Sequence, residues 1–181
     1  MPGVAKAYAG ADEFLAGFLR GELLEQVAVD CVAGVEVPVG AGDAIAGESL
    51  SGELWLVPPT DGGESFVVEG SAEKDGVIVP FAGTLSIDDS VVDADDGQSA
   101  AVIQRVRGIP VGGDISEGST LRVTVDATRW LAGADFSDLL AEVPDAEGIY
   151  RITSPNTVWA IWYYQVRQSG TSGPWGLSLE P

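Results

Sequence analysis

Five aspartates lie close together in residues 86–99, SIDDSVVDADDGQS, and this stretch contains no basic residue. Calcium takes six to eight oxygen ligands in proteins, and carboxylates are among its preferred donors. The stretch is therefore a candidate calcium site, and calcium is the one cofactor that the sequence suggests. The alternative is a solvated acidic turn between two strands. The candidate ligands are Asp88, Asp89, Asp93, Asp95 and Asp96.

The spacing of these aspartates does not match an EF-hand loop, in which ligands occupy positions 1, 3 and 12 and a glycine occupies position 6. With Gly97 at the sixth position, Val92 and Ile103 fall on the first and the twelfth, and neither has a side-chain oxygen. A calcium site at this place would therefore need oxygens from other loops, for which Asp114 and Asp126 are candidates.

A second candidate is the aromatic stretch TVWAIWYYQVR at residues 157–167. Alternation predicts a strand with one face in the core and with Trp159 and Tyr163 together on the other face, about 13 Å apart at ~3.3 Å per strand residue. If exposed, the two rings would form a platform that stacks sugar rings or contacts a partner. We therefore predict Trp159 and Tyr163 as ligand-binding residues for a glycan or another small ligand. The alternative is that a further element, such as an N-terminal helix, covers this face.

The residue types exclude several kinds of catalysis. The chain has no histidine, so neither Ser-His-Asp nor Cys-His catalysis is possible, and a histidine-based metal site is excluded as well. Cys31 is the only cysteine, and its alternation with Val27 and Val29 predicts a buried small side chain; an interchain disulfide or a reactive thiol is the alternative. Two carboxylates could hydrolyse a glycoside, but no pair stands out among 28 acids. We expect a non-enzymatic protein, with a carboxylate-dependent hydrolase as a distant alternative.

The net charge of −19, from 28 acids and 9 bases, limits the kinds of molecule that the protein can bind. Such a surface repels phosphate backbones and anionic lipids, so we predict no nucleic-acid partner. No apolar run approaches the length of a membrane-spanning helix. Acid-rich, lysine-poor surfaces are typical of salt-adapted proteins, because salt screens their self-repulsion. A GC-rich genome would produce a similar composition.

Apolar residues recur at intervals of four in residues 11–26, ADEFLAGFLRGELLEQ, which predicts an amphipathic helix. Its apolar stripe packs either on its own domain or on a protein partner. A neighbouring copy of the chain is one such partner, so residues 11–26 are a candidate surface for self-association. We expect residues 1–26 to form an N-terminal helical segment and residues 27–181 to form a single β-sandwich domain.

From residue 27 onward, short alternating segments separated by turn residues predict an antiparallel β-sandwich of jelly-roll or Ig-like type. Asp75-Gly76 is placed at the tip of a hairpin, because this dipeptide supplies the positive φ of a tight turn. Two short helical turns are expected near 127–143, beginning at Asp126 and at Asp135 or Ser137. The predicted strands are 27–32, 35–39, 53–57, 65–70, 77–82, 84–87, 100–107, 120–125, 149–153, 157–167 and 175–179.

Two segments carry a resemblance to known proteins. The first is FVVEGSAEKDGVIVPFAG at 66–83, which contains the turn SAEKDG. The second is TLRVTVDATRWLAGADFSDLL at 120–140, which contains V-D-A, R-W-L and D-F-S-D-L in that order. These segments resemble parts of bacterial cell-envelope lipoproteins of unknown function that are predicted to be β-sandwiches. The resemblance implies a sandwich fold and a cell-surface setting. It implies no catalytic residue.

Together these features favour a non-enzymatic structural or interaction protein, at a cell surface or in a larger assembly such as a virion or a filament. The alternative is a calcium-assisted module that binds a glycan or a small ligand. Acids and Arg20 interrupt residues 1–30, which therefore do not resemble a signal peptide. We expect either an intracellular protein or one whose export signal has been removed, and we favour an extracellular or cell-surface location.

Overall fold

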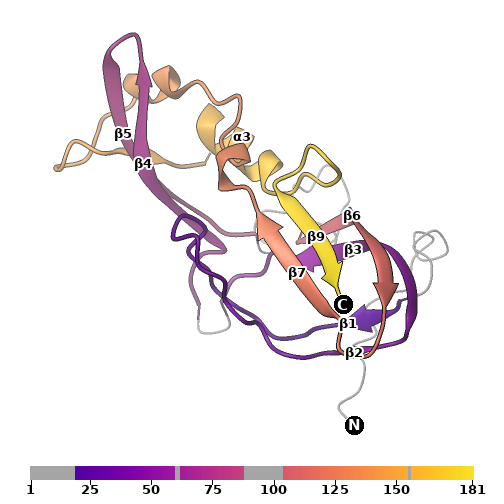
Figure 1. Ribbon diagram of the computed structural model, residues 1–181. Coiled ribbons are helices and arrows are strands. Elements are labelled where there is room, and N and C mark those ends of the chain that lie inside the picture. Colours follow the sequence, from indigo (N-terminus) through magenta and orange to yellow (C-terminus); the bar gives the residue numbers. More distant parts are fainter. Residues whose placement is uncertain (1–18, 60–61, 88–103, 155) are drawn as a thin grey trace, which may run out of the picture.

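The computed structural model describes residues 19–59, 62–87, 104–154 and 156–181 (Figure 1). In this part of the chain the protein is mainly β, with several small and mostly antiparallel sheets, as predicted. The strands are β1 (Gly21–Glu22), β2 (Asp43–Ala44), β3 (Gly47–Trp55), β4 (Phe66–Lys74), β5 (Val77–Leu85), β6 (Arg105–Ile115), β7 (Thr120–Val125), β8 (Tyr150–Ile152) and β9 (Trp175–Glu180); the helices are the 3-10 helices η2 (Ala127–Arg129) and η3 (Phe136–Ala141) and the α-helix α3 (Thr157–Gln165).

The hairpin of β4 and β5, here called the arm, extends away from β3, β6, β7 and β9 (Figure 1). Its two-residue turn has φ of 53° at Asp75 and 78° at Gly76, so the predicted Asp-Gly turn is confirmed. The register runs without interruption from the pair Phe66–Leu85 to the pair Lys74–Val77. The segments 77–82 and 84–87, predicted as two strands, contribute to the single strand β5. At its base, β5 also pairs in parallel with β8.

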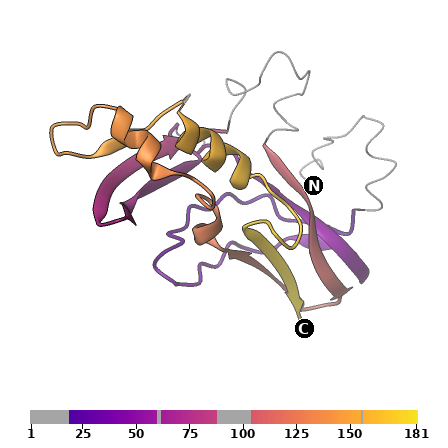
Figure 2. The same cartoon turned by 90° about the horizontal axis from the view of Figure 1, so that it is seen from above.

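The remaining long strands form two antiparallel pairs, β3 with β6 and β7 with β9. Both views place these pairs at the end of the molecule away from the arm (Figures 1 and 2). The two pairs are in close contact: a Cβ added at Gly52 on β3 would lie 2.4 Å from Cδ1 of Leu177 on β9. Glycine at position 52 therefore lets the side chain of Leu177 pack directly on the backbone of β3.

The hydrophobic core lies where the base of the arm, α3 and the two strand pairs meet. Trp162 of α3 is its largest fully buried side chain. The ring of Phe66 on β4 meets the ring of Trp130 edge to face, at 5.3 Å between centroids. The core cluster consists of Leu56, Val79, Phe81, Leu85, Ile87, Val106, Ile109, Trp130, Leu139, Ile152, Val158, Trp162, Tyr163, Val166 and Leu177.

The strand predicted at residues 157–167 is wrong, because this segment forms α3. The side chain of Asn156 caps the helix by accepting a hydrogen bond from the Trp159 N–H at 2.8 Å. The fully buried side chains of Val158, Trp162 and Val166 are four residues apart, and this spacing places them on one face of a helix. The same spacing also places three residues on one face of a strand, which is why alternation suggested the wrong element.

The predicted strands 27–32 and 35–39 are also wrong. Residues 23–42 form a long loop between β1 and β2, here called the β1–β2 loop, and they belong to no sheet. The predicted helix 11–26 is wrong over residues 19–26, which contain β1 and no helix; residues 11–18 lie outside the described part. The predicted strand 100–107 is described from residue 104 onward, and there β6 begins at Arg105.

Both predicted helical turns are confirmed, as 3-10 helices. The carboxylate of Asp126 accepts from the Thr128 N–H at the start of η2, and that of Asp135 accepts from the Ser137 N–H at the start of η3. Asp135 also pairs with Lys74 Nζ at 3.1 Å, which attaches the tip of the arm to η3. None of the helices in the described residues is long and apolar enough to cross a membrane.

Candidate functional site

The five aspartates of the predicted calcium site lie outside the residues that the structure describes, so calcium binding stays a prediction. They are Asp88, Asp89, Asp93, Asp95 and Asp96. Within the described ranges, no group of three or more His, Cys, Asp or Glu side chains is placed to hold a metal ion. Asp126, a candidate for completing the site, instead caps η2 and pairs with Arg129.

Trp159 and Tyr163 lie side by side on α3, although not in the way that a strand would place them. Their ring centroids are 5.3 Å apart and their planes differ by 5°, so the rings stack on each other. The predicted separation of about 13 Å is wrong, because residues four apart are adjacent on a helix surface. The two aromatic residues therefore form one stacked pair and not two separate rings of a flat platform.

This stacking limits what the pair can bind. Tyr163 is only 9% exposed, and the Arg167 guanidinium lies 4.9 Å from its ring centroid, within the range of a cation–π contact. Trp159 is half-buried and packs against the core cluster. Because Tyr163 covers one face of the Trp159 ring, at most the other face is left for a sugar ring. The ligand-binding role of Trp159 and Tyr163 stays a prediction.

Several carboxyl groups have lowered pKa values, and hydrogen bonds from nearby backbone and side-chain groups explain each of them. Hydrogen bonds from Ser137 and Lys74 lower the pKa of Asp135 to about 2. The pKa of Asp126 is lowered chiefly by the Thr128 hydroxyl, and that of Asp145 chiefly by the Ile149 N–H, with further help from Arg151. Perturbed pKa values often mark active sites, but structural networks perturb them too. Here the carboxylates hold turns in place.

Cys31 begins a turn at residues 31–34 of the β1–β2 loop and is half-buried against the core cluster. Burial raises the pKa of its thiol, and the neighbouring charge of Asp30 raises it further. A raised pKa lowers the thiolate fraction, so this environment makes the thiol less reactive. The position agrees with the interpretation of Cys31 as a small packing residue.

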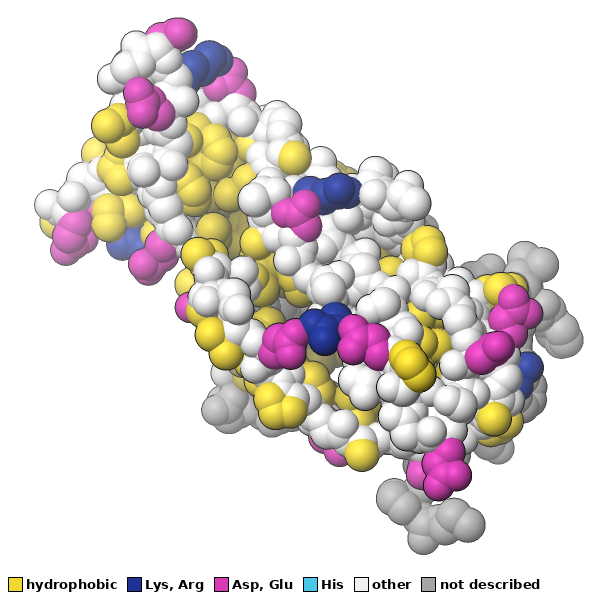
Figure 3. Space-filling model, in the orientation of Figure 1, with side chains coloured by type: hydrophobic (Ala, Val, Ile, Leu, Met, Phe, Trp, Pro, Cys, Tyr) yellow, Lys and Arg dark blue, Asp and Glu magenta, His cyan; other side chains and the backbone are white. Residues whose placement is uncertain are grey.

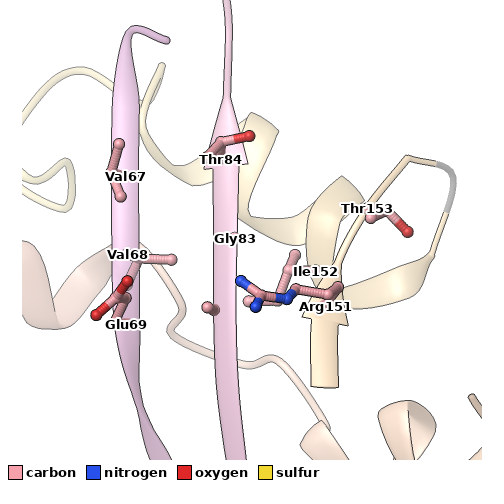
Figure 4. Close-up of a pocket in the computed structure, with 9 residues that line it drawn as sticks. Val67, Val68, Glu69, Gly83, Thr84, Arg151, Ile152 and Thr153 are labelled. Atoms are coloured by element: carbon pink, nitrogen blue, oxygen red, sulfur yellow. The ribbon is translucent and has the colours of Figure 1, made fainter. Parts of the chain in front are cut away.

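A shallow hollow of about 210 Å³ lies on the outer face of the sheet β4–β5–β8 (Figure 4). Its floor is formed by the small residues Ala82 and Gly83, and Glu69 and Arg151 lie on opposite sides of β5. Arg151 donates through Nε to Asp145 Oδ2 at 2.8 Å. Glu69 on β4 is the acidic residue that lines the hollow.

A second hollow of about 420 Å³ lies between η2 and the strands β7 and β9. Its main polar group is Arg129, which donates to the carbonyl oxygens of Thr171 at 3.0 Å and Gly173 at 3.1 Å and pairs with Asp126 at 2.9 Å. These contacts fasten residues 170–174 to η2. Arg129 is thus a structural residue of this hollow.

The β1–β2 loop carries an unusual amount of exposed apolar side chain. Val32 is 90% exposed and Val35 is 70% exposed, and further exposed residues continue on both sides of them. Figure 3 shows hydrophobic side chains reaching the surface along the path of this loop in Figure 1. Single exposed apolar residues are normal, whereas several along one loop make it a candidate interaction surface. Between Leu19 and Ile45 the exposed large hydrophobic residues are Leu19, Leu23, Leu24, Val27, Val29, Val32, Val35, Val37 and Ile45.

The loop is nevertheless fastened to the body at several places. Gln26 Nε2 donates to the carbonyl oxygens of Val57 at 3.3 Å and Pro58 at 2.9 Å. Glu36 forms an ion pair with Arg122 on β7. These contacts hold the loop against the body while its valines remain on the outside. Sequence reasoning missed this surface because alternating valines are also the signal for a half-buried strand.

A scan against protein-family models and searches of curated proteins and of solved structures found no match to this chain.

Proposed function

We propose that the protein is a non-enzymatic structural component that self-associates through its β1–β2 loop. The single observation that carries this proposal is the series of exposed valines on a loop that Gln26 and Glu36 hold against the body. A loop of this length without secondary structure is uncommon in a compact domain, where such loops are usually either functional or linker segments. Burial of the valines by a neighbouring copy gives the row a stabilising role that it lacks in a single chain.

The setting of such an assembly is part of the same proposal. A virion, a filament or a cell surface suits a strand-rich and acidic protein, and we place the chain in one of these. We further propose that the pairs β3–β6 and β7–β9 are the two layers of a small sandwich of jelly-roll or Ig-like type. The contact between Gly52 and Leu177 supports this arrangement.

The test compares the oligomeric state of the wild-type protein with that of Val32→Ser/Val35→Ser, by analytical ultracentrifugation over a range of concentrations. Complete burial of a valine side chain contributes roughly 1.5 kcal/mol or more. Loss of two such contacts should weaken association by roughly 3 kcal/mol, or about a hundredfold. We therefore expect the wild type to form oligomers and the double variant to be mainly monomeric at the same concentration.

The matched control is Ile78→Ser/Val143→Ser, which removes two equally exposed apolar side chains outside the loop. It should associate like the wild type. A wild-type protein that stays monomeric at every concentration would contradict the proposal. So would equal weakening by the loop variant and the control.

A further inference from the structure

Strand β4 has two backbone edges, and within the residues that the structure describes only one of them is paired. The sheet order is β4–β5–β8, so β4 is an edge strand. In a hairpin with a two-residue turn, the two residues that flank the turn exchange backbone hydrogen bonds; here they are Lys74 and Val77. Further along the hairpin, pairs that exchange hydrogen bonds alternate with pairs that do not. The N–H and C=O groups of Val67, Glu69, Ser71 and Glu73 therefore point away from β5.

Pro80 provides an independent check on this alternation. It pairs with Ser71, and it has no N–H to donate. A proline fits in a hairpin strand only where its nitrogen faces away from the partner strand. The pair Ser71–Pro80 is therefore a non-bonded pair, as counting from the turn requires.

The two edges of the arm differ in how they are protected. Exposed sheet edges are usually blocked by proline, by a bulge or by a covering element, because an open edge pairs with other chains. The outer edge of β5 carries Pro80 and, at its base, β8. The edge of β4 contains no proline, its register with β5 has no bulge, and Val67 is 64% exposed. Among the described residues, the outer edge of β4 is therefore open, whereas that of β5 is blocked by Pro80 and by β8.

The charge on this edge is negative. Glu69 and Glu73 lie on the outer face of β4 on either side of Ser71. The only basic residue of β4 is Lys74, and it is paired with Asp135. Arg151 belongs to β8, on the other side of β5 from β4; its guanidinium extends over β5 (Figure 4) and donates to Asp145. The whole chain adds to this field with its net charge of −19.

We propose that the open edge of β4 binds an extended basic segment of a different protein by strand addition. The backbone groups at residues 67, 69, 71 and 73 would supply the main-chain hydrogen bonds, and these give affinity in this mode of recognition. Lysine or arginine side chains four residues apart on the added strand would lie opposite Glu69 and Glu73, as favourable cross-strand pairs. The hollow beside Val67 and Glu69 would take a side chain of the added strand.

A second copy of this chain is a poorer occupant of the same edge. Pairing β4 with its own copy would bring four carboxylates, Glu69 and Glu73 from each chain, onto one face of the joined sheet. Like charges that are close in a sheet are destabilising. The inference extends the proposed function by a second surface and a different partner, and it does not depend on the β1–β2 loop.

The probe is a capped, fluorescently labelled nine-residue peptide of threonine and valine, with lysine at its third and seventh positions. Its binding to the full chain is measured by fluorescence anisotropy, next to the same peptide with glutamate at those two positions. We expect saturable binding of the lysine peptide that weakens as salt is added. The glutamate peptide should bind at least tenfold more weakly.

Two proline variants separate the two edges of the arm. Ser71→Pro removes an outward N–H of β4 and should weaken peptide binding at least tenfold. Ile78→Pro removes an outward N–H from the other edge of the arm, on β5. Like Ser71, Ile78 belongs to a pair that exchanges no backbone hydrogen bonds between β4 and β5. This variant should change peptide binding less than twofold. Should Ser71→Pro fail to fold, Glu69→Gln/Glu73→Gln provides the test, because it keeps the backbone and should remove most of the salt dependence.

Four results would overturn the inference: no binding of the lysine peptide, equal binding of the glutamate peptide, equal effects of the two proline variants, or unchanged salt dependence in the double glutamine variant. A wild-type dimer that Ser71→Pro dissociates would assign the edge to a second copy and would overturn it as well. The variant Val32→Ser/Val35→Ser should bind the peptide like the wild type. Peptide binding and self-association can therefore fail separately.

Discussion

One carboxylate, that of Asp135, connects two distant parts of the chain. It accepts hydrogen bonds from the Ser137 N–H at 3.0 Å and from the Ser137 hydroxyl at 2.5 Å, and so begins η3. It also pairs with Lys74 at the tip of the arm. Its pKa falls from 3.8 to about 2 because these donors favour the charged form. The position of the arm therefore depends in part on the ionisation of a single side chain.

We predict that Asp135 makes stability depend on pH in a defined window. A group whose pKa is lower in the folded state stabilises the fold fully at pH values above its unfolded pKa, which is 3.8 for this carboxyl group. The contribution should be lost as the pH falls from about 4 to about 2, where the folded protein also binds the proton. Urea unfolding at a series of pH values measures it as the difference between the wild type and Asp135→Asn.

The two proteins should differ in free energy of unfolding at neutral pH and converge near pH 2. Lys74→Gln should show a smaller difference of the same sign, because Ser137 still donates to the carboxylate in this variant. Asp114→Asn on β6 is the control for loss of one negative charge. A difference between wild type and Asp135→Asn that is the same at pH 2 and pH 7 would show that the charge has no role.

At the scale of elements, the joint between the arm, β8 and α3 depends on Gly83. A Cβ at this position would lie 2.7 Å from Ile152 Cβ on β8 and 3.3 Å from Trp162 Cζ3 on α3. Both neighbours are buried, and the Cβ of Ile152 moves only if the backbone of β8 moves. Glycine is therefore required for β8 and α3 to pack this closely on β5.

We predict that Gly83→Ala destabilises the protein by about 1–3 kcal/mol, the usual cost of overpacking a core. Thermal or urea unfolding measures this loss. Gly52→Ala is the matched comparison, since its added methyl would meet only the side chain of Leu177, chiefly its flexible end at Cδ1. Gly83→Ala should therefore cost more than Gly52→Ala. Equal costs would mean that the arm base repacks as easily as the strand pairs.

The elements that sequence reasoning predicted correctly are those whose cause is local. The hairpin turn follows from Asp75-Gly76, and the two 3-10 helices follow from capping by Asp126 and Asp135. Each signal acts within four residues of chain, so no knowledge of the tertiary structure was needed. The strands β4, β5, β7 and β9 were predicted for the same reason, since regular alternation and flanking turns are visible locally.

The elements that were missed depend on partners far away in the chain. Val35 and Val37 alternate like strand residues, but no strand within the described ranges pairs with them, so they lie in a loop. The spacing of Val158, Trp162 and Val166 fits both a strand and a helix, and the cap at Asn156 was the local signal that could have decided it. Because the segment was predicted as a strand, Trp159 and Tyr163 were predicted about 13 Å apart, whereas on the helix their rings stack. The open edge of β4 is visible only once the sheet order is known.

At the scale of the whole molecule, the charge of −19 predicts a stability that rises with ionic strength. Salt screens repulsion between like charges on the surface, and screening acts over about 10 Å at 0.1 M. We expect the melting temperature to rise as sodium chloride is added. Choline chloride at the same ionic strength should give an equal rise if the cause is screening and not binding of a particular ion.

Calcium chloride at matched ionic strength extends the same experiment to the acidic residues 88–96. A bound cation adds stability by ligand linkage beyond the screening effect. A melting temperature higher than in choline chloride would support calcium binding, and an equal one would argue against it. In the sodium chloride series, a melting temperature that falls with added salt would contradict the proposed repulsion between the protein's own negative charges.

The pairing of distant strands also has a consequence for how the molecule folds. β3 pairs Gly47 with Ile115, and β7 pairs Thr120 with Glu180, whereas the arm joins neighbours around a two-residue turn. Contacts between residues far apart in sequence slow folding, because a long stretch of chain must be ordered before they form. We expect the arm to form early, while synthesis of the chain continues. β7 then stays without its partner until residues 175–180 have left the ribosome.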